Sequence, residues 1–413
     1  MQVAGMPFSL VLVMFVPGHM FSWAVEWAWL GLQTVLSITW LFVYRNRLAR
    51  VAGIAPQAWT GFFLLVTAVG FLSCLHAAVV MNMQISSSDI QDVLRFLIFI
   101  PIALFIGSAD RTLFADQVAK VLKFVVVFNL VTATMLLLNL PGLAHAIMVI
   151  YEEAKIQFDF GHIRIGIPFT NPNFAALVFV LAIGYFVFFR KSLLFVVLAT
   201  ISLFLTGSRS GLLSSVPIFV AAYVLYIAKS FRNVKIMLVL LVLHIVVVVS
   251  LSTALDAMGG IARIVELLNA LAAGDLGQVD TASIRFELVQ EALKFIERSP
   301  WLGVGSGRSY GLDVTDSQLI AWPVMYGIPV ALLITFFFAW IFLGAIRKTR
   351  SYEHILGLIA TAAGFFLMLS TGDFMKNYRL FFITVLIAHA MHLAVAERPA
   401  TGSVEQDIAV PVA

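Results

Sequence analysis

About a dozen long apolar stretches run through this chain, separated by short segments that hold most of its charged residues. A helix that crosses a bilayer needs about 20 consecutive, mostly apolar residues, and most of these stretches reach or approach that length. Hydrophobic residues make up 61% of the chain and charged residues only 12%, which is outside the range of soluble globular domains. The sequence therefore predicts an all-α, polytopic membrane protein with about 12 transmembrane helices.

Lys and Arg residues between the apolar stretches indicate how the chain is oriented. Basic clusters fall on every second connection, around Arg45, Arg111, Arg190, Arg232 and Arg347. Because short cytoplasmic loops carry an excess of Lys and Arg, these connections and both termini are expected to face the cytoplasm of a bacterial inner membrane. The first apolar stretch has no basic leader and is expected to be an uncleaved span. The predicted spans are approximately 7–25, 28–44, 58–81, 92–109, 121–139, 172–189, 192–206, 210–228, 236–254, 319–344, 354–370 and 378–395.

The remaining connections are expected to be periplasmic, and they set the predicted organisation. Residues 1–254 hold nine spans and include the external segment 140–171. Residues 255–318 form a large periplasmic loop, and a long polar segment of this kind usually carries function. Residues 319–395 hold the last three spans, and residues 396–413 form a cytoplasmic tail that we expect to be disordered.

One part of the large loop has the pattern of an amphipathic helix. Phe286, Val289, Leu293 and Ile296 recur at helical spacing. The remaining faces carry charged and polar residues: Glu287, Gln290, Glu291, Lys294 and Glu297. We expect this helix to lie on the external membrane face or against the bundle of spans.

Several functional classes are excluded by the composition. The only cysteine, Cys74, lies inside an apolar stretch, so an intrachain disulfide and a cysteine-rich metal site are ruled out. The net charge of +4 comes without a dense basic tract, which argues against nucleic acid as a partner. There is no Walker-type phosphate loop, and Gly303, Gly305 and Gly307 follow a predicted helix, which favours a tight turn or hinge. No metal and no cofactor are therefore expected.

Two arginines occupy unusual places on the predicted periplasmic side. Arg209 lies in Thr206-Gly-Ser-Arg-Ser-Gly211, where one apolar stretch ends and the next begins almost without a loop. Arg285 opens the amphipathic helix of the large loop. Taken alone, Arg209 could simply extend its guanidinium to the membrane interface, and Arg285 could be a solvated or salt-bridged surface residue.

Other polar residues come directly before predicted spans on the same side. Arg164, with His162 beside it, precedes Asn171-Pro172-Asn173. Asparagine caps free helix amides and proline is favoured in the first turn, so a capping role is the first interpretation of this tripeptide. Asp316 and Ser317 precede a later span and allow the same interpretation. Because all these residues lie next to span ends on one face, they are also candidates for a substrate site.

An ordered set of motifs over residues 170–331 resembles the O-antigen ligase and Wzy-type polymerase superfamily. These motifs are Thr170-Asn-Pro-Asn173, Thr206-Gly-Ser-Arg-Ser-Gly211, Ser283-Ile-Arg-Phe286, Ser299-Pro-Trp-Leu-Gly-Val-Gly305, and Asp316-Ser317 with Gly327 in the next span. The resemblance implies a glycosyltransferase that acts on polyprenyl-diphosphate-linked sugars at the periplasmic face, without metal or nucleotide. It also implies that Arg209 and Arg285 bind the donor diphosphate.

Arginine suits that role chemically. Two guanidinium groups can hold a diphosphate through paired, charge-assisted hydrogen bonds and stabilise the charge that develops as the sugar departs. The candidate catalytic residues are Arg209, Arg285 and Asp316. The candidate substrate-binding residues are His162, Arg164, Asn171, Asn173, Ser208, Arg308 and Ser317.

The chain departs from the family pattern at one position. Ligases of the family generally carry a His-Asn pair before the span that follows the large loop, whereas this chain has Asp316-Ser317. Polymerases of the superfamily often have an acidic residue there, so the departure favours a polymerase. The Asp316 carboxylate could accept the proton of the attacking hydroxyl or orient that hydroxyl. His162 is the alternative residue for this role.

The sequence therefore predicts an inverting polymerase that joins undecaprenyl-diphosphate-linked oligosaccharide repeats into O-antigen or exopolysaccharide. Donor and acceptor glycans and membrane lipids are the expected partners, and a chain-length regulator and a flippase are further candidates. A ligase that transfers the glycan to lipid A-core or to a protein is the close alternative. A transporter of lipid-linked oligosaccharide is the distant alternative. A transporter should carry charges deep within several spans, whereas the charges of this chain cluster at one face.

Overall fold

The computed structural model of the chain describes residues 31, 35, 38, 54–87, 89–94, 96–97, 100, 111–138, 140, 142–151, 156–159, 162–169, 171–229, 280–305, 317–349, 351–371 and 378–396. The predicted spans 7–25, 28–44 and 236–254 and the predicted tail lie wholly or almost wholly outside the described residues, as does much of the span 92–109.

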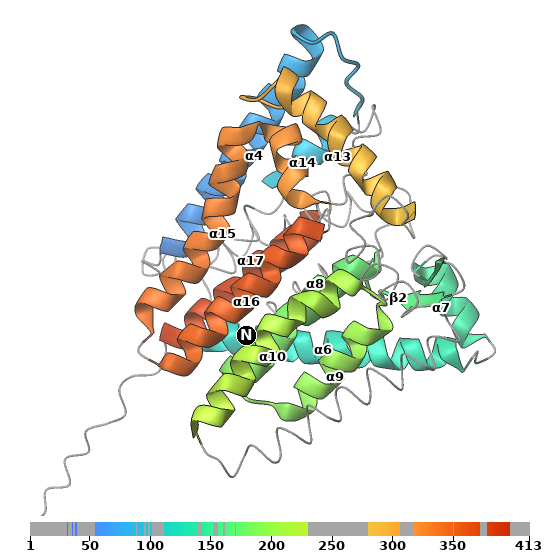
Figure 1. The fold of residues 1–413 in the computed structure, drawn as a ribbon, viewed down its shortest axis with the longest axis vertical. Helices are drawn as coiled ribbons and strands as arrows, with labels where there is room; N and C mark the ends of the chain where they lie inside the picture. Colours follow the sequence, from blue (N-terminus) through green and yellow to red (C-terminus); the bar gives the residue numbers. More distant parts are fainter. Residues whose placement is uncertain are drawn as a thin grey trace, which may run out of the picture.

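The described part of the chain is almost entirely helical (Figure 1). Five helical segments in it are long and apolar enough to cross a membrane. They belong to α4 (Ile54–Val79), α6 (Arg111–Leu137), α8 (Pro172–Gly184) with its π-helical continuation η2 (Tyr185–Arg190), α15 (Ile328–Lys348) and α16 (Tyr352–Thr371). The bundle also contains α9 (Leu193–Leu205), α10 (Arg209–Lys229) and α17 (Tyr378–Ala396), with the shorter or amphipathic helices α7 (Leu143–Tyr151), α13 (Asp280–Arg298) and α14 (Gln318–Tyr326). The prediction of a helical, multi-pass membrane protein is confirmed at this level.

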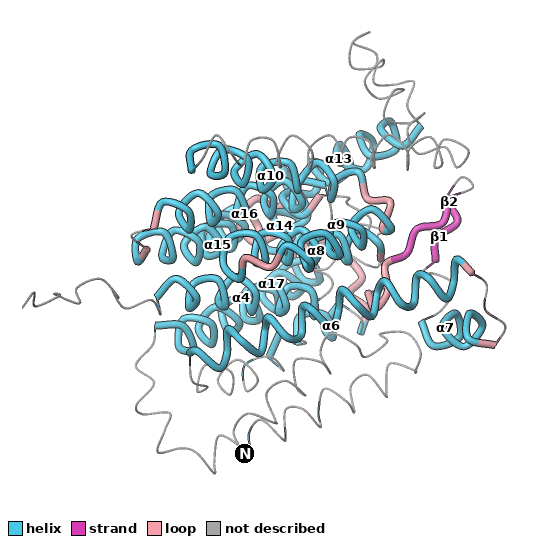
Figure 2. The backbone as a smooth tube through the Cα atoms, turned by 90° about the horizontal axis from the view of Figure 1, so that it is seen from below, coloured by secondary structure: helices cyan, strands magenta, loops and turns pink. Residues whose placement is uncertain are grey.

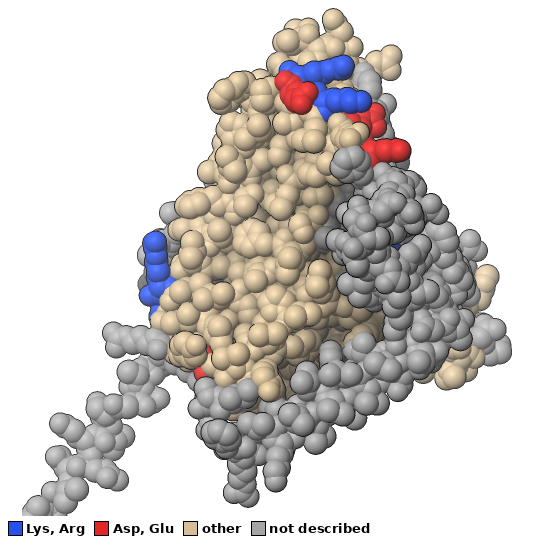
Figure 3. All heavy atoms as spheres, viewed as in Figure 1, with Lys and Arg blue, Asp and Glu red and all other residues tan. Residues whose placement is uncertain are grey.

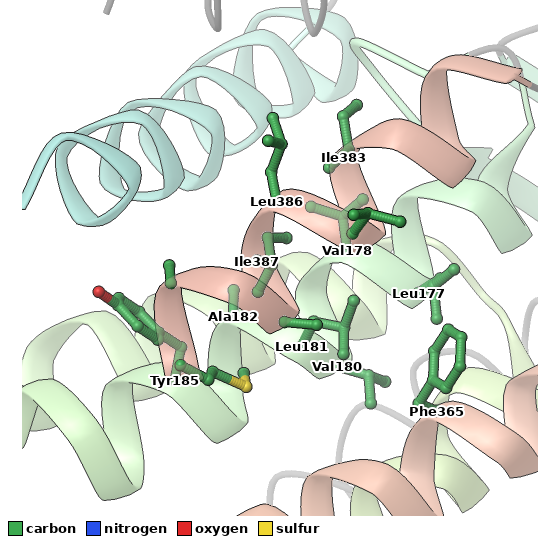
Figure 4. Packing of buried hydrophobic residues seen from close by; sticks show 14 of the residues in the cluster. Leu177, Val178, Val180, Leu181, Ala182, Tyr185, Phe365, Ile383, Leu386 and Ile387 are labelled. Carbon is green, nitrogen blue, oxygen red and sulfur yellow. The ribbon is translucent and has the colours of Figure 1, made fainter. Parts of the chain in front are cut away.

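Helix α8 forms the centre of the bundle. It is apolar around its whole circumference, and all its residues from Ala175 to Gly184 are buried. A helix with this pattern must be covered on every side, and α9, α10, α16 and α17 all pack against it. Figure 4 shows side chains of α8 meeting Phe365 of α16 and Ile383 and Ile387 of α17 in the largest apolar cluster.

Small residues allow α16 to approach its neighbours closely. A β-carbon on Gly364 would overlap the main-chain oxygen of Ser214 in α10, and a β-carbon on Gly184 of α8 would overlap the side chain of Thr361. Apolar surfaces gain little from meeting each other in lipid, so membrane helices depend on such close contact for their packing.

The outer surface of the bundle suits a bilayer. Large apolar side chains are exposed along the outward faces of its helices, for example Leu65 and Leu72 on α4, Val131 on α6 and Phe336 on α15. On the face seen in Figure 3, Lys, Arg, Asp and Glu residues gather over α13 and at the far end of α15, with a broad uncharged surface between them. Charges at two ends and an apolar belt between them are expected of a protein that crosses a membrane.

Ion pairs connect η2 and Lys191 to α6 and α16 at the end of the bundle where η2 ends. Arg190 Nη1 lies 2.6 Å from Asp116 Oδ1 of α6, and Lys191 Nζ lies 2.7 Å from Glu353 Oε2 of α16. Arg190 Nε also donates a 3.2 Å hydrogen bond to Tyr185 Oη. The arginine and lysine predicted on this connection are therefore tied to both neighbouring helices, and we call this the Arg190 end.

The opposite end carries a β-hairpin that the all-α prediction did not contain. Strand β1 (Ile156–Asp159) pairs in antiparallel fashion with β2 (His162–Ile165), and Asp159 lies opposite His162. Figure 2 shows the hairpin standing at one end of the helices. Each strand has only four residues, too few for an alternating pattern to be recognised in the sequence. We call this the hairpin end.

Two helix boundaries also differ from the predicted spans. Helix α6 begins at Arg111, ten residues before the predicted span 121–139, and so includes Lys120. The charged segment 111–120, predicted to be a connection, forms the first turns of α6. The predicted span 319–344 is two helices, because Gly327 adopts a left-handed φ of 78° between α14 and α15.

Candidate functional site

The N-terminus of α8 is built around the predicted Asn171-Pro172-Asn173 motif. Asn171 is the N-cap, and its Oδ1 accepts a 2.8 Å hydrogen bond from the Asn173 amide. Pro172 occupies the first turn, where a missing amide hydrogen costs nothing. Gly166 lies so close to this turn that a β-carbon there would be 2.8 Å from the Pro172 main chain. The predicted capping role of Asn171 is confirmed.

Arg164 joins two of the predicted motifs to the β-hairpin. It extends from β2, and its Nε donates a 3.1 Å hydrogen bond to the Thr206 carbonyl oxygen. Its Nη2 donates a 3.0 Å hydrogen bond to Asn173 Oδ1. The planar guanidinium therefore holds the hairpin, the start of α8 and the turn between α9 and α10 in one arrangement. Of the candidates named from the sequence, Arg164, Asn171, Asn173 and Ser208 are brought together here.

The turn before Arg209 is held by its own polar groups. Thr206 Oγ1 donates to the Leu203 carbonyl oxygen at 2.6 Å and accepts from the Ser208 amide at 3.2 Å. Gly207 has a φ of 58°, and a β-carbon there would lie 3.2 Å from Arg164 Cγ. The turn therefore needs glycine both for its backbone conformation and for the space that Arg164 fills.

Ser208 completes the turn as the cap of α10. Its Oγ accepts a 3.2 Å hydrogen bond from the Gly211 amide, the pattern of an N-cap side chain. Arg209 is the first residue of α10; its side chain lies outside the described part of the structure. Its position at the hairpin end of α10 follows from the backbone.

Two helix N-termini thus meet at the hairpin end. Arg164 bonds to the first turn of α8 and to the residue that leads into α10. The first amides of α8 are bonded to Asn171, and the Gly211 and Leu212 amides of α10 are bonded to Ser208. Both helix N-termini still carry partial positive charge. This charge and the Arg164 guanidinium favour an anion such as a phosphate nearby.

Asn129 is a residue of this region that our interpretation of the sequence passed over. It lies in the middle of α6, is fully buried, and its Nδ2 donates a 2.6 Å hydrogen bond to the Ile167 carbonyl oxygen. This contact fixes the loop that leads from Arg164 to the cap of α8. The signal was present in the sequence, because an asparagine within an apolar span needs a polar partner.

Helix α13 confirms the predicted amphipathic helix and corrects its buried face. Ala292 is fully buried, and Phe295 and Ile296 pack beside it, whereas Leu293 is 46% exposed. The buried face of α13 is therefore shifted by about one residue toward the N-terminus from the predicted apolar face. Arg285 lies in the first half of α13, and its side chain is outside the described part.

The remaining candidates lie near α14 or are not described. Ser317 is the N-cap of α14, but its side chain makes no capping hydrogen bond. Asp316 and Arg308 lie outside the described residues, and for His162 the backbone alone is described. Helix α13 packs on α14, and in Figure 1 it extends from the end of α4 toward the side on which β2 and the start of α8 lie. Of the described candidates, only those around Arg164 are thus brought together, whereas Ser317 is the N-cap residue of α14 and Arg285 belongs to α13.

Residues 194–334 match the family model described as O-antigen ligase. This part, about a third of the chain, is similar to the O-antigen ligase family. This match confirms the resemblance predicted from the motifs. The matched region contains the turn before Arg209, α13 and α14, whereas Arg164 and the cap of α8 precede it. A comparison with curated proteins found no match.

The described polar groups at the hairpin end include several hydrogen-bond donors. Among the described residues, no group of three or more His, Cys, Asp and Glu side chains could hold a metal ion. The described groups at the hairpin end that could bind a ligand include the Arg164 guanidinium and the hydroxyls of Ser208 and Ser210, whose Oγ atoms are 3.2 Å apart. All of these can donate hydrogen bonds to oxygen anions.

Proposed function

We propose that the protein is an inner-membrane glycosyltransferase that polymerises undecaprenyl-diphosphate-linked oligosaccharide repeats at the periplasmic face. The observation that carries the proposal is the O-antigen ligase match, because it includes the turn that presents Arg209 and the helix that carries Arg285. The partial positive charge of the α8 and α10 N-termini near that turn supports an anionic ligand there.

In the proposed reaction Arg209 and Arg285 bind the diphosphate of the donor, whose glycan is the growing chain. The bond between the anomeric carbon and the phosphate oxygen breaks, and undecaprenyl diphosphate leaves. A hydroxyl of the incoming lipid-linked repeat attacks from the opposite face, so the anomeric centre is inverted. Asp316 accepts the hydroxyl proton and later returns it to water. The donor is already activated, so no nucleotide is required.

The other candidates support this reaction in different ways. Arg164, Asn171 and Asn173 hold the two helix N-termini together, which fixes the backbone from which Arg209 extends. The hydroxyl of Ser208 caps α10. His162, Arg308 and Ser317 are proposed to contact the sugars of the donor or acceptor.

A ligase is the second candidate function, and the description of the matching family as O-antigen ligase favours it. The Asp316-Ser317 pair favours the polymerase, because ligases of the family generally carry His-Asn there. The two functions differ only in the acceptor, so the same donor site serves both.

The glycan profile of a deletion strain tests the proposed function. A polymerase defect should leave single repeats on surface lipid or protein and abolish long chains, because transfer of one repeat to its carrier does not need the polymerase. Absence of all surface glycan, with lipid-linked polymer accumulating in the membrane, would identify a ligase instead. An unchanged profile would contradict both.

The proposed orientation predicts a labelling pattern. Single cysteines near Asp159 and Asp275, introduced into a Cys74→Ala background, should react in whole cells with an impermeant thiol reagent added from outside. A cysteine near Arg232 should not react until the inner membrane is opened, because basic connections stay in the cytoplasm. The reverse pattern would place the hairpin end on the cytoplasmic side and remove the proposed site.

A further inference from the structure

At the helix break at Gly327, backbone groups of α14 and α15 form hydrogen bonds with an earlier segment of the chain. In an unbroken helix the Ile328 amide would bond to the Val324 carbonyl oxygen. Instead, Ile328 donates to the Pro300 carbonyl oxygen at 2.7 Å, and the Val304 amide donates to Val324 at 2.7 Å. Residues 299–305, which directly follow α13 and which we call the anchor segment, thus supply the backbone partners that the break leaves open.

Polar side chains hold the anchor segment from both sides. The Ser73 hydroxyl of α4 lies within hydrogen-bonding distance of the Leu302 carbonyl oxygen and of the Val69 carbonyl oxygen in its own helix. Ser299 Oγ donates to the Gly303 carbonyl oxygen at 2.9 Å and lies 3.3 Å from His76 Nδ1. Since the single hydroxyl proton of Ser299 goes to Gly303, the proton between Ser299 and the histidine belongs to His76 Nδ1. His76 is therefore a donor in this contact.

Glycines make the fit of the anchor segment tight. Gly303 and Gly305 have left-handed φ angles of 71° and 76°. A β-carbon on Gly305 would lie 2.6 Å from Cys74 Sγ, and one on Gly327 would overlap the Trp301 carbonyl oxygen. Cys74, the only cysteine of the chain, is consequently buried beneath the anchor segment, with 5% of its surface exposed.

The anchor segment couples α13 to the membrane helices. Ser73 belongs to Thr60–Val79, one of the segments able to cross a membrane, and unpaired backbone groups are strongly disfavoured inside a membrane. Ala292 of α13, Ala77 of α4 and Val324 of α14 form one apolar cluster beside it. Figure 1 shows α13 and α14 together against the upper part of α4. Helix α13 therefore cannot shift without breaking these bonds.

We propose that the anchor segment, through Ser299 and His76, is a positioning element of the transfer reaction: it fixes α13, and with it Arg285, against α14, whose start follows Asp316. This role rests on the proposed function, in which Arg285 binds the donor diphosphate and Asp316 serves the acceptor. Ser299 and His76 touch neither substrate and act through the placement of α13.

The test combines kinetics with the reactivity of Cys74 in the full-length protein. Ser299→Ala and His76→Leu should each lower kcat about ten-fold while leaving KM for the lipid-linked donor within about two-fold, because the misplaced guanidinium is needed mainly as charge develops. Modification of Cys74 by N-ethylmaleimide, followed by mass spectrometry, should be about ten-fold faster or more in both variants, since the segment that covers the thiol opens more often.

Two variants serve as controls. His76→Asn places an amide donor near the position of Nδ1 and should restore both kcat and slow modification of Cys74. Gly61→Ala, also on α4 but with nothing within 4 Å of its new β-carbon, should behave as the unsubstituted protein.

Four results would overturn the proposal. Rapid modification of Cys74 with an unchanged kcat in Ser299→Ala and His76→Leu would mean that these side chains hold the anchor segment in place but that its placement does not affect the reaction. A lowered kcat with unchanged modification, or no rescue by His76→Asn, would mean that these side chains act in another way. A parent protein that extends no lipid-linked repeat would remove the proposed function and this role with it, whereas slow Cys74 modification would still report the docked segment.

Discussion

Replacement of Arg209 or of Arg285 by lysine should lower turnover by about 10²-fold or more, which corresponds to about 3 kcal/mol of lost transition-state stabilisation. Lysine keeps the positive charge but loses the planar pair of donors that grips two phosphate oxygens at once. The effect should appear in kcat more than in KM for the donor, because charge on the departing diphosphate is greatest in the transition state. The measurement is the rate at which purified protein extends lipid-linked repeats.

The matched control for these substitutions is Arg347→Lys. Arg347 is exposed in the last turn of α15, away from the proposed site, so the substitution should leave turnover unchanged. All variants should reach the membrane in normal amounts. If both site variants work at nearly the normal rate, Arg209 and Arg285 are interface residues and the proposed diphosphate site is wrong.

Asp316→Asn should give the second large effect, slowing transfer about 10²-fold or more while binding of the donor lipid is retained. Asparagine can still orient a hydroxyl but cannot accept its proton. Single-turnover transfer and equilibrium binding of the donor, measured on the same preparation, separate the two steps. Loss of donor binding would mean that Asp316 belongs to the diphosphate site rather than to the acceptor site.

His162→Ala distinguishes the two candidates for the acceptor role. His162 lies in β2, two residues before Arg164, at the hairpin end. If Asp316 serves the acceptor, His162→Ala should lower turnover only modestly through sugar contacts. A silent Asp316→Asn variant together with an inactive His162→Ala variant would assign the acceptor proton to the histidine.

Much of the bundle could be predicted because each span is an independent signal. An apolar stretch of sufficient length becomes a helix in lipid whatever its neighbours do, since its backbone groups must be paired internally. The predicted spans 354–370 and 378–395 accordingly lie within α16 and α17. The break at Gly327 could not be predicted from hydropathy, because the apolar stretch continues across it. The residues whose backbone bonds to the broken helix, such as Val304, are also distant in the sequence.

The local parts of the site were also predictable, and its assembly was not. The cap by Asn171 follows from its own motif, and the turn before α10 lies where two apolar stretches nearly touch. Which groups Arg164 would bond could not be read from the sequence, because its partners Asn173 and Thr206 come together only when the hairpin folds against two helices. The short strands of that hairpin gave no periodic signal.

The most direct test of the central claim is reconstitution of the purified protein in liposomes with undecaprenyl-diphosphate-linked repeats, with excess chelator and without nucleotide. We predict a ladder of longer glycans and release of one undecaprenyl diphosphate for each repeat joined, both lost in a protein that carries Arg209→Lys and Arg285→Lys together. Repeats that stay unextended, or that cross the bilayer without release of undecaprenyl diphosphate, would contradict the account.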